Sequence, residues 1–365
     1  MIVGVPKETK SDEYRVSLLP VGAHLLCSDG QTVLVETGAG SGSGFSDEMY
    51  VEAGAQIVNT ADEVFERSDM VIKVKEPQPE EIKKLRPQQV LFTYFHFAAD
   101  RALTEGCLES KVTAVAYETL SDRAGALPLL TPMSEVAGKL SIQEGAKYLE
   151  KPMLGRGILL GGVAGVPAGN VLILGGGVVG TNAARMAAGL GANVTIMDIN
   201  LDRLRYLDDV MPPNVTTVYS DPHEIERFAI QADLIVGAVL IVGDRAPKLL
   251  PKSLLAKMKE GAVVVDVSID QGGCLETARP TTHKDPIYII DGVVHYCVAN
   301  MPGAVGRTST RALCNATLPY ARQLAASGVD DFCNIDPGRA AAMNMRDGKI
   351  TNAAVAQAFP NLPSA

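Results

Sequence analysis

The segment that runs from Gly169 to Gly180 constrains the fold of this chain more than any other part of its sequence. It reads GNVLILGGGVVG, so an apolar run ends directly in a group of closely spaced glycines. A second apolar run follows at Val194–Asp198 and ends in a carboxylate. This order is typical of a buried strand, a glycine turn, the start of a helix and a second strand.

Each glycine of this turn has a separate physical purpose. Gly175 allows the tight turn, Gly177 lets the backbone approach a pyrophosphate, and Gly180 lets the helix pack closely on the strand. A helix that begins near Val178 directs its free N–H groups and the positive end of its dipole at phosphate groups. The segment therefore predicts a dinucleotide site.

Asp198 adds a second, independent sign of the same site. It follows the glycines by about twenty residues, the distance at which a carboxylate accepts hydrogen bonds from the two ribose hydroxyls. A carboxylate at that place repels a 2′-phosphate, so we expect NAD rather than NADP. A glycine-rich turn between core elements is the alternative, and it leaves the position of this carboxylate to chance.

The composition favours a large protein with well-covered sheets. The chain has 365 residues, which predicts two domains, and 47% of them are hydrophobic while 21% are charged. Parallel sheets that are covered on both faces have such a composition. The net charge of −9 argues against nucleic acid or an anionic membrane as the main partner.

The cysteines and the N-terminus indicate a cytoplasmic protein. No two of the six cysteines have CxxC spacing, and the N-terminus does not resemble a signal peptide. We expect reduced cysteines that serve in packing. No cluster of metal-ligating residues is evident, and we predict no catalytic metal. These cysteines are Cys27, Cys107, Cys274, Cys297, Cys314 and Cys333.

One uncharged stretch is long enough to suggest a membrane span. No residue from Gly157 to Ala184 is charged. The stretch nevertheless holds many glycines together with Pro167 and Asn170, and it contains the glycine turn. We therefore interpret it as a loop followed by a buried strand and predict no transmembrane helix.

The first part of the chain alternates apolar runs with amphipathic stretches. This alternation predicts parallel βαβ units. The amphipathic stretches are Ser46–Ala53, Ala61–Glu66 and Asp100–Glu109. The expected strands are Ile2–Val5, Thr32–Glu36, Gln56–Val58, Met70–Val74, Val90–Phe95 and Val112–Ala116.

The second part repeats this logic after a helical pattern at Met133–Leu149, which resembles a connector. Residues after Gly303 are helical again, most clearly at Thr308–Ala325, and we expect this strandless tail to return to the first domain. The expected strands of the second part are Val171–Leu174, Val194–Met197, Thr216–Tyr219, Leu234–Ala238, Val263–Val267 and Ile287–Ile290.

The predicted fold class is α/β, with two doubly wound, Rossmann-like parallel-sheet domains and a cleft between them. We expect a discontinuous substrate-binding and catalytic domain at 1–130 plus 305–365. The dinucleotide-binding domain is expected at 131–304.

Ligands of open parallel sheets bind beyond the carboxyl ends of the strands. That rule selects four polar side chains in this chain, which are expected to converge beside the nicotinamide. Lys75 follows the strand Met70–Val74, His96 follows Val90–Phe95, and Asp270 follows Val263–Val267. The loop after the first strand carries Arg15.

Each of these residues also has a structural interpretation. His96, between two phenylalanines, is compatible with a hydrogen-bonded core histidine. Lys75 is compatible with a solvated strand-end charge, as is Lys73. Asp270 precedes two glycines and is compatible with the start of a turn, and Arg15 is compatible with an ion pair to an acid such as Glu8.

Eight segments of the sequence together resemble the motifs of one known family. They are Val3–Glu8, Glu13–Pro20, Glu36–Gly40, Val71–Pro77, Tyr94–His96, Leu172–Gly180, Val265–Gly273 and Val298–Pro302. The chain resembles, over essentially its whole length, the alanine dehydrogenase/transhydrogenase α-subunit family, and within it the L-alanine dehydrogenases.

The resemblance implies a role for each candidate. Arg15 and Lys75 would hold the substrate carboxylate and carbonyl, and His96 and Asp270 would act as acid/base residues. Family members often form hexamers. The positions expected at the NAD site are Ser134, Gly175, Gly177, Val178, Val179, Gly180, Asp198, Arg203, Ser220, Val239, Leu240, Ile269, Asp270, Asn300 and Met301.

The reaction that the resemblance implies is reversible conversion of L-alanine, NAD⁺ and water to pyruvate, ammonium and NADH. A guanidinium suits the bidentate carboxylate, and a histidine exchanges protons readily near neutral pH. Three alternatives remain. They are a transhydrogenase-type subunit, which the absence of apolar segments after Pro302 disfavours, a dehydrogenase for another amino or imino acid, and a non-catalytic NAD sensor.

Overall fold

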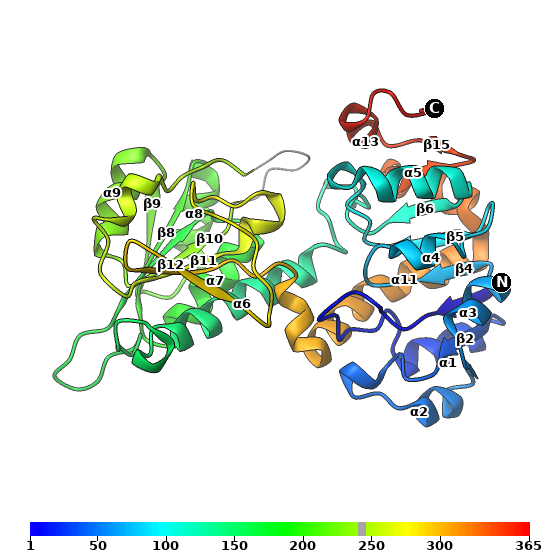
Figure 1. Ribbon diagram of the computed structural model, residues 1–365, viewed down its shortest axis with the longest axis horizontal. Coiled ribbons are helices and arrows are strands. Elements are labelled where there is room, and N and C mark those ends of the chain that lie inside the picture. Colours follow the sequence, from blue (N-terminus) through cyan, green and yellow to red (C-terminus); the bar gives the residue numbers. More distant parts are fainter. Residues whose placement is uncertain (240–245) are drawn as a thin grey trace. The chain divides into compact units, whose positions relative to one another are not determined.

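The computed structural model describes residues 1–239 and 246–365. The chain divides into two compact units, and each is built on its own sheet with helices beside it (Figure 1). Unit 1 comprises Met1–Met133 and Gly303–Ala365, and unit 2 comprises Ser134–Pro302. Each unit is an α/β layer structure, and the predicted fold class of two Rossmann-like parallel-sheet domains is confirmed in this respect.

Unit 1 contains an eight-stranded sheet in the order β15-β14-β6-β5-β4-β1-β2-β3. Strands β3, β2, β1, β4, β5 and β6 are parallel, and Val3 of β1 lies opposite Val33 of β2 and Met70 of β4. Their short apolar runs are buried, as a sheet covered on both faces requires. The bounds are β1 Ile2–Val5, β2 Thr32–Glu36, β3 Gln56–Val58, β4 Met70–Ile72, β5 Val90–Thr93 and β6 Thr113–Ala116.

Two of these strands end earlier than predicted. The apolar runs continue to Val74 and Phe95, but β4 ends at Ile72 and β5 ends at Thr93. Two further backbone hydrogen bonds, from the Lys73 N–H to the Phe92 carbonyl and from the Tyr94 N–H to the Val74 carbonyl, precede the loops that carry Lys75 and His96. Apolar character therefore overstates strand length wherever the loop itself is packed into the core.

The tail after Gly303 contains strands, so the prediction of a strandless tail is wrong. β14 (Met343–Arg346) pairs antiparallel with β6, and β15 (Lys349–Ile350) pairs antiparallel with β14. The pairing of β14 with β6 shifts register between Met343 and Met345. β14 reads Met-Asn-Met-Arg and does alternate apolar and polar residues, and Asp347-Gly348 between β14 and β15 is a typical hairpin turn, so the signal was present in the sequence but extends over only a few residues.

The helices of unit 1 are mostly short and begin with recognisable caps. Thr60 and Asp100, for example, accept hydrogen bonds from backbone N–H groups of the first turns of α3 and α5. The long helix α11 has a non-helical residue at Gly328, where φ is 78°. The helices are α1 Pro20–Ser28, α2 Asp47–Glu52, α3 Ala61–Arg67, α4 Pro79–Ile82, α5 Arg101–Ser110, α11 Gly306–Cys333, α12 Pro337–Ala340 and α13 Ala353–Ala358, with 3₁₀ turns η1 Ser41–Ser43 and η2 Phe97–Ala99.

Unit 2 contains a seven-stranded sheet in the order β12-β13-β11-β10-β7-β8-β9. Among the described strands of this sheet, the edge strand β12 alone is antiparallel, and its partner β13 was not predicted from the sequence. The strand order changes direction between β7 and β10, which marks the switch point where ligands of this fold bind. The bounds are β7 Asn170–Leu174, β8 Asn193–Asp198, β9 Val215–Tyr219, β10 Leu234–Gly237, β11 Val263–Asp266, β12 Ile287–Ile290 and β13 Val293–Tyr296.

The helices of unit 2 follow the strands in the expected alternation. The helical pattern predicted at Met133–Leu149 is helix α6, Thr131–Tyr148, which runs from the end of unit 1 into unit 2. The other helices are α7 Val178–Gly189, α8 Leu201–Val210, α9 Pro222–Gln231 and α10 Lys252–Leu255, with 3₁₀ turns η3 Lys151–Met153, η4 Val267–Gln271 and η5 Met301–Val305.

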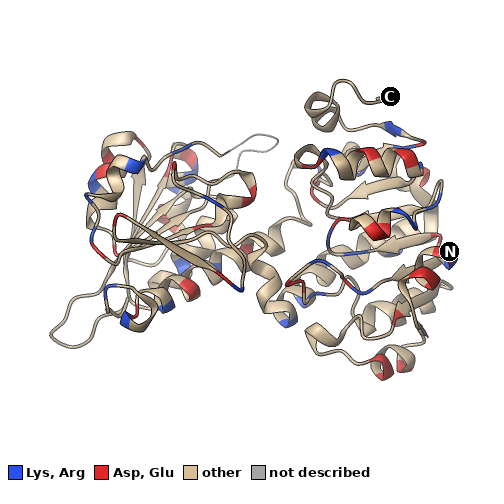
Figure 2. Ribbon diagram, viewed as in Figure 1, with Lys and Arg blue, Asp and Glu red and all other residues tan. Residues whose placement is uncertain are grey.

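The uncharged stretch 157–184 forms a loop, the buried strand β7 and the first half of α7, as the sequence indicates. Its loop carries no charged residue and is tan throughout in Figure 2. Among the described residues, no helix is long and apolar enough to cross a membrane.

Candidate active site

The glycine turn between β7 and α7 has the geometry that its sequence predicts. Gly175 has φ of 106°, a backbone conformation that residues with a side chain rarely adopt. A Cβ at this position would lie 2.6 Å from the carbonyl oxygen of Ala238. A Cβ on Gly180 would lie 1.8 Å from the carbonyl oxygen of Gly175. Both positions therefore require glycine for the fold itself.

Gly177 differs from the other two glycines because open space surrounds it. It is the N-cap residue of α7 and has φ of −67°, and a Cβ built on it meets no atom within 4 Å. The fold would therefore accept a side chain at this position. The first turn of α7, with Val178 and Val179, begins directly after this open position, and the N–H groups of a first helical turn are suited to an anion.

Asp198 ends β8 beside this turn. Its Oδ2 accepts a hydrogen bond of 2.7 Å from the N–H of Gly176, and its Oδ1 accepts one of 2.8 Å from the N–H of Asn200. These two bonds fix the orientation of the carboxylate against the turn. Each carboxylate oxygen has more than one acceptor direction, so ribose hydroxyls can bind as well.

Arg203, in α8, binds to the same turn. Its Nε donates to the carbonyl oxygen of Gly176 at 2.6 Å, and its Nη2 donates to Thr181 Oγ1 at 2.8 Å. The guanidinium also lies over the ring of Tyr206, 4.9 Å from its centroid. These contacts connect α8 to the glycine turn.

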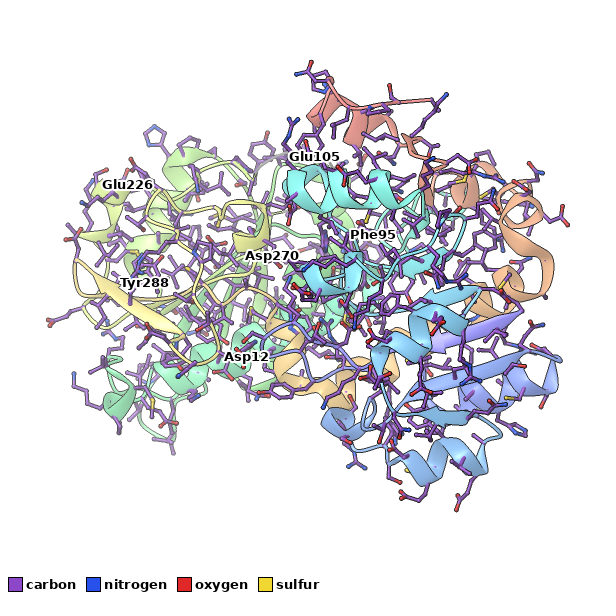
Figure 3. All side chains as sticks on the ribbon, turned by 45° about the vertical axis from the view of Figure 1, so that its right-hand side comes forward. Asp12, Phe95, Glu105, Glu226, Asp270 and Tyr288 are labelled. Atoms are coloured by element: carbon purple, nitrogen blue, oxygen red, sulfur yellow. The ribbon has the colours of Figure 1, made fainter. Side chains whose placement is uncertain are left out.

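Other positions expected at the nucleotide site also follow the carboxyl ends of unit 2 strands. Ser220 follows β9, and its N–H donates to the carbonyl oxygen of Asp198 at 3.0 Å. Val239 follows β10, and its carbonyl accepts from Ser268 Oγ at 2.8 Å. Ile269 and Asp270 lie on η4 after β11, where Asp270 is exposed (Figure 3).

The remaining expected positions are less regular. Ser134 lies in the first turn of α6 and is half-buried. Asn300 has φ of 59°, and its carbonyl lies 3.3 Å from Nε2 of His283. Met301, which begins η5, is buried. Leu240 lies outside the described residues.

Asp266, at the end of β11, is a titratable group that the sequence analysis did not identify. Its side chain is fully buried, and its oxygens accept from the N–H groups of Ser268 at 3.1 Å and Cys274 at 2.9 Å. Burial raises the pKa of this carboxyl to about 6, against the opposing effect of the hydrogen bonds. The only signal in the sequence is an acidic residue at the end of a very apolar run.

Arg15, in unit 1, is buried and paired with Glu13 rather than with Glu8. Its Nε lies 2.6 Å from Glu13 Oε1, its Nη2 lies 2.5 Å from Glu13 Oε2, and its Nη1 lies 3.0 Å from Met133 Sδ. Burial alone would lower the pKa of the guanidinium, but the Glu13 carboxylate raises it above its ordinary value. Arg15 is thus held as a cation in a bidentate pair.

Glu8 instead binds Lys73, so the interpretation of Lys73 as a solvated charge is wrong. Lys73 is fully buried, with Nζ 3.0 Å from Glu8 Oε2 and 2.9 Å from Glu81 Oε1. Glu8 Oε1 also accepts from the N–H of Val74 at 2.6 Å. Burial raises the pKa of Glu8, while the two carboxylates more than offset the effect of burial on Lys73 and raise its pKa.

Lys75 follows this buried cluster and is half-buried. Its carbonyl oxygen accepts a hydrogen bond of 2.9 Å from Thr93 Oγ1, which ties the loop after β4 to the end of β5. The next residue, Glu76, forms an ion pair with Lys10. Glu76 is half-buried, and although burial opposes ionisation, the cations of Lys10 and Lys75 lower the pKa of its carboxyl.

His96 follows β5 and is exposed, so it is not a core histidine. Its ring is parallel to that of Tyr94 within 7°, with the centroids 6.0 Å apart. Tyr94 is itself buried, donates to the carbonyl of Leu129 at 2.5 Å, and interacts electrostatically with the Arg15 cation. Tyr94 is thus a part of the candidate site that was not predicted from the sequence.

Three of the four candidate residues thus belong to unit 1. Thr93 links the Lys75 loop to β5, and Tyr94 connects the surroundings of Arg15 with those of His96. Asp270 belongs to unit 2 and is described with that unit. Unit 1 therefore offers a cationic group for a carboxylate and an exposed imidazole at the carboxyl ends of adjacent strands.

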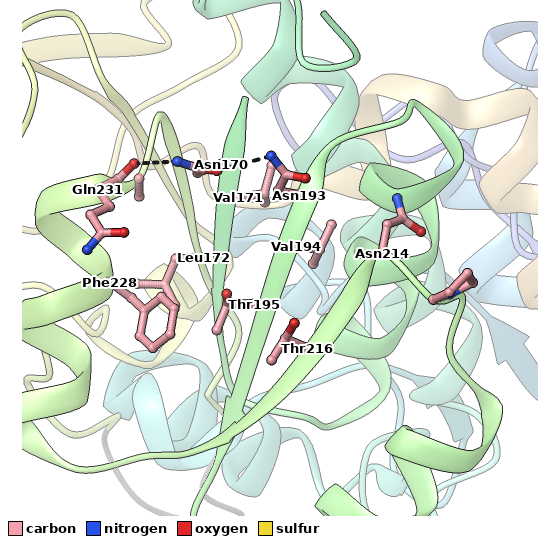
Figure 4. A pocket seen from close by; sticks show the side chains of 12 residues that line it. Asn170, Val171, Leu172, Asn193, Val194, Thr195, Asn214, Thr216, Phe228 and Gln231 are labelled. Carbon is pink, nitrogen blue, oxygen red and sulfur yellow. Dashed lines mark hydrogen bonds between the residues drawn. The ribbon is translucent and has the colours of Figure 1, made fainter. Parts of the chain in front are cut away.

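A pocket of about 280 Å³ lies on unit 2 (Figure 4). It is at the amino ends of the strands, whereas the glycine turn follows the carboxyl end of β7. It includes Asn170 and Asn193, which begin β7 and β8, and the amide of Asn170 donates to the carbonyl of Gln231 at 3.1 Å. The residues that line it are uncharged. Its position at the amino ends of the strands separates it from the glycine turn.

Comparison with known protein families identifies two matching profiles. Residues 4–137 match the N-terminal domain of the alanine dehydrogenase/PNT family, and residues 141–353 match its C-terminal domain. Together the two matches extend over nearly the whole chain.

Individual relatives agree with the family match. The chain is 52% identical to an alanine dehydrogenase of Halomonas elongata, over 98% of this chain and 97% of the relative. It is 51% identical to an alanine dehydrogenase of Methanococcus maripaludis, over 98% of this chain and 96% of the relative.

Solved structures show the same fold. One described as L-alanine dehydrogenase superposes with a TM-score of 0.95 at 52% identity and covers 99% of each chain. A transhydrogenase from Sinorhizobium meliloti superposes with a TM-score of 0.84 at 23% identity, over 96% of this chain and all of that chain, and shares the fold.

Proposed function

Because this chain belongs to the alanine dehydrogenase/PNT family, we propose that it is an NAD-dependent L-alanine dehydrogenase. It converts L-alanine, NAD⁺ and water reversibly to pyruvate, ammonium, NADH and a proton. The observation that carries the proposal is identity of about half of all residues to alanine dehydrogenases over nearly the full chain. The residues of unit 1 described above fit an amino acid substrate.

NAD is the proposed cofactor, and unit 2 fits it. The open space at Gly177, before the first turn of α7, suits the pyrophosphate, and the oriented Asp198 carboxylate suits the ribose hydroxyls. When bound, NAD⁺ accepts the hydride from the substrate Cα. The other positions expected to line the site are Ser134, Gly175, Val178, Val179, Gly180, Arg203, Ser220, Val239, Leu240, Ile269, Asp270, Asn300 and Met301.

Arg15 and Lys75 are the proposed substrate-binding residues. A guanidinium recognises a carboxylate in a bidentate manner, and Glu13 holds that of Arg15 in a fixed orientation. Lys75 is expected to stabilise negative charge that develops on the substrate oxygen. An oriented pair of cations reduces the entropy lost when a small, flexible substrate is positioned for reaction.

His96 and Asp270 are the proposed acid/base residues. Loss of hydride from L-alanine leaves an iminium, which water attacks to form a carbinolamine, and this collapses to pyruvate and ammonia. His96 is expected to take a proton from the attacking water and to return one as the carbinolamine collapses. Asp270 is expected to orient water or ammonia and to favour the cationic iminium through its negative charge.

The family resemblance also suggests the molecular setting. We propose a homohexamer in the cytoplasm, with L-alanine, pyruvate and ammonium as small-molecule partners and with neither nucleic acid nor membrane. A transhydrogenase-type subunit is the alternative of a different class, and its isolated chain would not oxidise amino acids.

A spectrophotometric assay tests the proposal. The purified protein is incubated with NAD⁺ or NADP⁺ and a panel of L-amino acids, and formation of NADH or NADPH is followed by the near-ultraviolet absorbance of the reduced nicotinamide. Rapid reduction of NAD⁺ with L-alanine is the expected result. Activity on a different amino acid would change the substrate, and tight NADH binding without activity on any amino acid would favour the transhydrogenase-type subunit.

A further inference from the structure

The backbone at His96 is held in an unusual conformation. His96 has φ of 54° and ψ of 39°, in the left-handed region that residues with a Cβ adopt at a cost of about 1 kcal/mol. Such a conformation persists only where the surroundings impose it. The contacts around His96 identify what imposes it.

The first constraint is the side chain of Glu118, two residues beyond the end of β6. Its Oε1 accepts hydrogen bonds from the N–H of His96 at 2.6 Å and from the N–H of Phe95 at 3.1 Å, and its Oε2 lies 3.3 Å from the same Phe95 nitrogen. The ladder between β5 and β6 has ended here, since its final pair is Thr93 with Ala116. The carboxylate of Glu118 thus replaces the strand carbonyls that these two amides would otherwise bind.

The second constraint is the pair of phenylalanines that flank His96. Phe95 and Phe97 are each 1% exposed, and their rings stack with centroids 4.4 Å apart and an interplanar angle of 14°. Both belong to the same apolar cluster of unit 1, and Phe95 is labelled in Figure 3. The residue between two neighbours buried on the same side must present its side chain elsewhere, and the His96 imidazole is exposed and stacked on Tyr94.

From these contacts we infer that Glu118 is a positioning residue of the dehydrogenase reaction, and that it acts through His96 by accepting both backbone N–H groups. This inference rests on the proposed function and on the proposed role of His96. The phenylalanine rings and the Tyr94 ring contact the segment through apolar packing and stacking, which are less directional than hydrogen bonds. The hydrogen bonds from the two N–H groups to the Glu118 carboxylate have the directionality needed to determine the backbone dihedral angles at His96.

Two conservative substitutions of Glu118 distinguish the effect of its side-chain length from the effect of its negative charge. Glu118→Gln keeps the side-chain length and an oxygen in the place of Oε1, but it removes the negative charge. Glu118→Asp keeps the charge but retracts the carboxylate by one methylene, so that it no longer reaches both amides. Glu118→Ala removes both properties, and Glu109→Ala, at an exposed glutamate of α5, is the matched control.

The variants are compared by kcat and KM for L-alanine, by NADH affinity from fluorescence, and by thermal denaturation. We expect Glu118→Ala and Glu118→Asp to lower kcat by about 10- to 100-fold, because misplacement by about 1 Å has effects of that size. We expect KM for L-alanine and the NADH affinity to change by less than about threefold, since Arg15, Lys75 and unit 2 are untouched. Glu118→Gln should keep kcat within about threefold of the wild type.

A double-mutant cycle with His96→Ala tests whether Glu118 acts through His96. In the His96→Ala background, Glu118→Ala is expected to change the residual rate by less than about twofold, because a group that acts only through an absent partner adds nothing. The same loss in both backgrounds would overturn the inference. A wild-type kcat in Glu118→Ala, or a Glu118→Asp variant more active than Glu118→Gln, would also overturn it.

Failure of the proposed function itself gives a different pattern. In that case the wild-type chain has no activity on L-alanine, or His96→Ala keeps the wild-type rate, whatever the residue at position 118. Either result removes the premise and overturns the inference with it.

Discussion

The candidate sites of the two units are built by different physical means. Unit 1 surrounds the candidate substrate residues with buried charges, namely the pair Arg15–Glu13 and the cluster of Lys73, Glu8 and Glu81. The candidate nucleotide site of unit 2 is built on a backbone turn. Gly175 and Gly180 of this turn have no room for a Cβ, whereas Gly177 has open space around it at the start of α7. Charge dominates the first arrangement and shape dominates the second.

This difference follows from what each unit is proposed to bind. A small carboxylate offers little apolar surface, so its recognition depends on rigidly held cations, and buried cations need buried partners. A dinucleotide offers phosphates that backbone N–H groups can approach closely. We therefore expect unit 1 to be most sensitive to changes of charge and unit 2 to be most sensitive to added atoms.

The largest effect is expected when the buried cluster of unit 1 loses its cation. Lys73→Met leaves Glu8 and Glu81 close together without a counter-charge, and removal of one member of a buried ion pair typically costs about 3–5 kcal/mol in the free energy of unfolding. Denaturant unfolding measures this change. Lys83→Met removes the exposed pair with Glu80 and should cost less than about 1 kcal/mol. Equal effects of the two substitutions would contradict the importance of burial.

Unit 2 also contains a buried ionisable carboxyl, that of Asp266. The pKa of Asp266 is raised to about 6 in the folded protein, whereas an unfolded aspartate titrates near about 3.9. The folded state therefore binds more protons between these values, and the Asp266 contribution to stability falls as the pH rises from about 4 to about 6, by up to about 3 kcal/mol.

The free energy of unfolding, measured across this pH range for the wild type and for Asp266→Asn, checks the prediction. The difference between the two curves should change over that interval and become constant above it. Asp266→Asn also places an amide near the N–H groups of Ser268 and Cys274, so the slope is the diagnostic quantity rather than the absolute stability. A constant difference across the whole range would show that burial does not shift this group.

Added methyl groups test the shape dependence of unit 2. Gly180→Ala places a Cβ 1.8 Å from the carbonyl oxygen of Gly175, and we expect a loss of about 1–3 kcal/mol in unfolding free energy together with weaker NADH binding. Gly177→Ala meets no protein atom, so it should weaken NADH binding without that loss of stability. Thermal denaturation and NADH titration measure the two properties separately.

The control for both substitutions is Gly189→Ala, at the end of α7, where a Cβ also meets no atom within 4 Å. It should leave NADH binding unchanged. If Gly177→Ala binds NADH as well as Gly189→Ala does, the open space at Gly177 is not the phosphate site.

The smallest expected effect concerns the choice of cofactor. Asp198→Ala removes the carboxylate proposed to bind the ribose hydroxyls, and loss of such hydrogen bonds should weaken NADH binding about tenfold, or about 1.4 kcal/mol. The preference for NAD over NADP should relax, because the repulsion of a 2′-phosphate is lost. Kinetic constants with both cofactors measure this preference, and an unchanged preference would contradict the proposed role of Asp198.

Much of the fold was predictable from local patterns. Strands β1, β2, β3 and β12 have the bounds that their apolar runs predict, and the glycine turn lies where its spacing places it. β14 was not predicted, because its pairing with β6 depends on residues distant in the sequence and on a shift in register. The ends of β4 and β5 were placed too late, since the loops that follow them are also packed in the core.

The candidate site was predictable only in its chemistry-bearing residues. Arg15, Lys75, His96 and Asp270 were selected because they follow strands, and their catalytic roles stay predictions. Neither the roles of Glu13 and Glu118 nor the burial of Lys73 was predicted from the sequence. A charged residue can have the same neighbours in the sequence whether its side chain is solvated or paired in the interior. Which two charged side chains form an ion pair depends on their distance in the folded protein, and their separation along the sequence does not determine that distance.

The sequence by itself determined the strand–turn–helix unit of the nucleotide site and the α/β class, because hydrophobic periodicity and the conformational freedom of glycine are local properties. Only the tertiary structure decided which carboxylate pairs with which cation and how the backbone at His96 is held. Those outcomes depend on burial, since the low polarity of the interior makes every unpaired charge or amide costly and thereby selects one arrangement of partners.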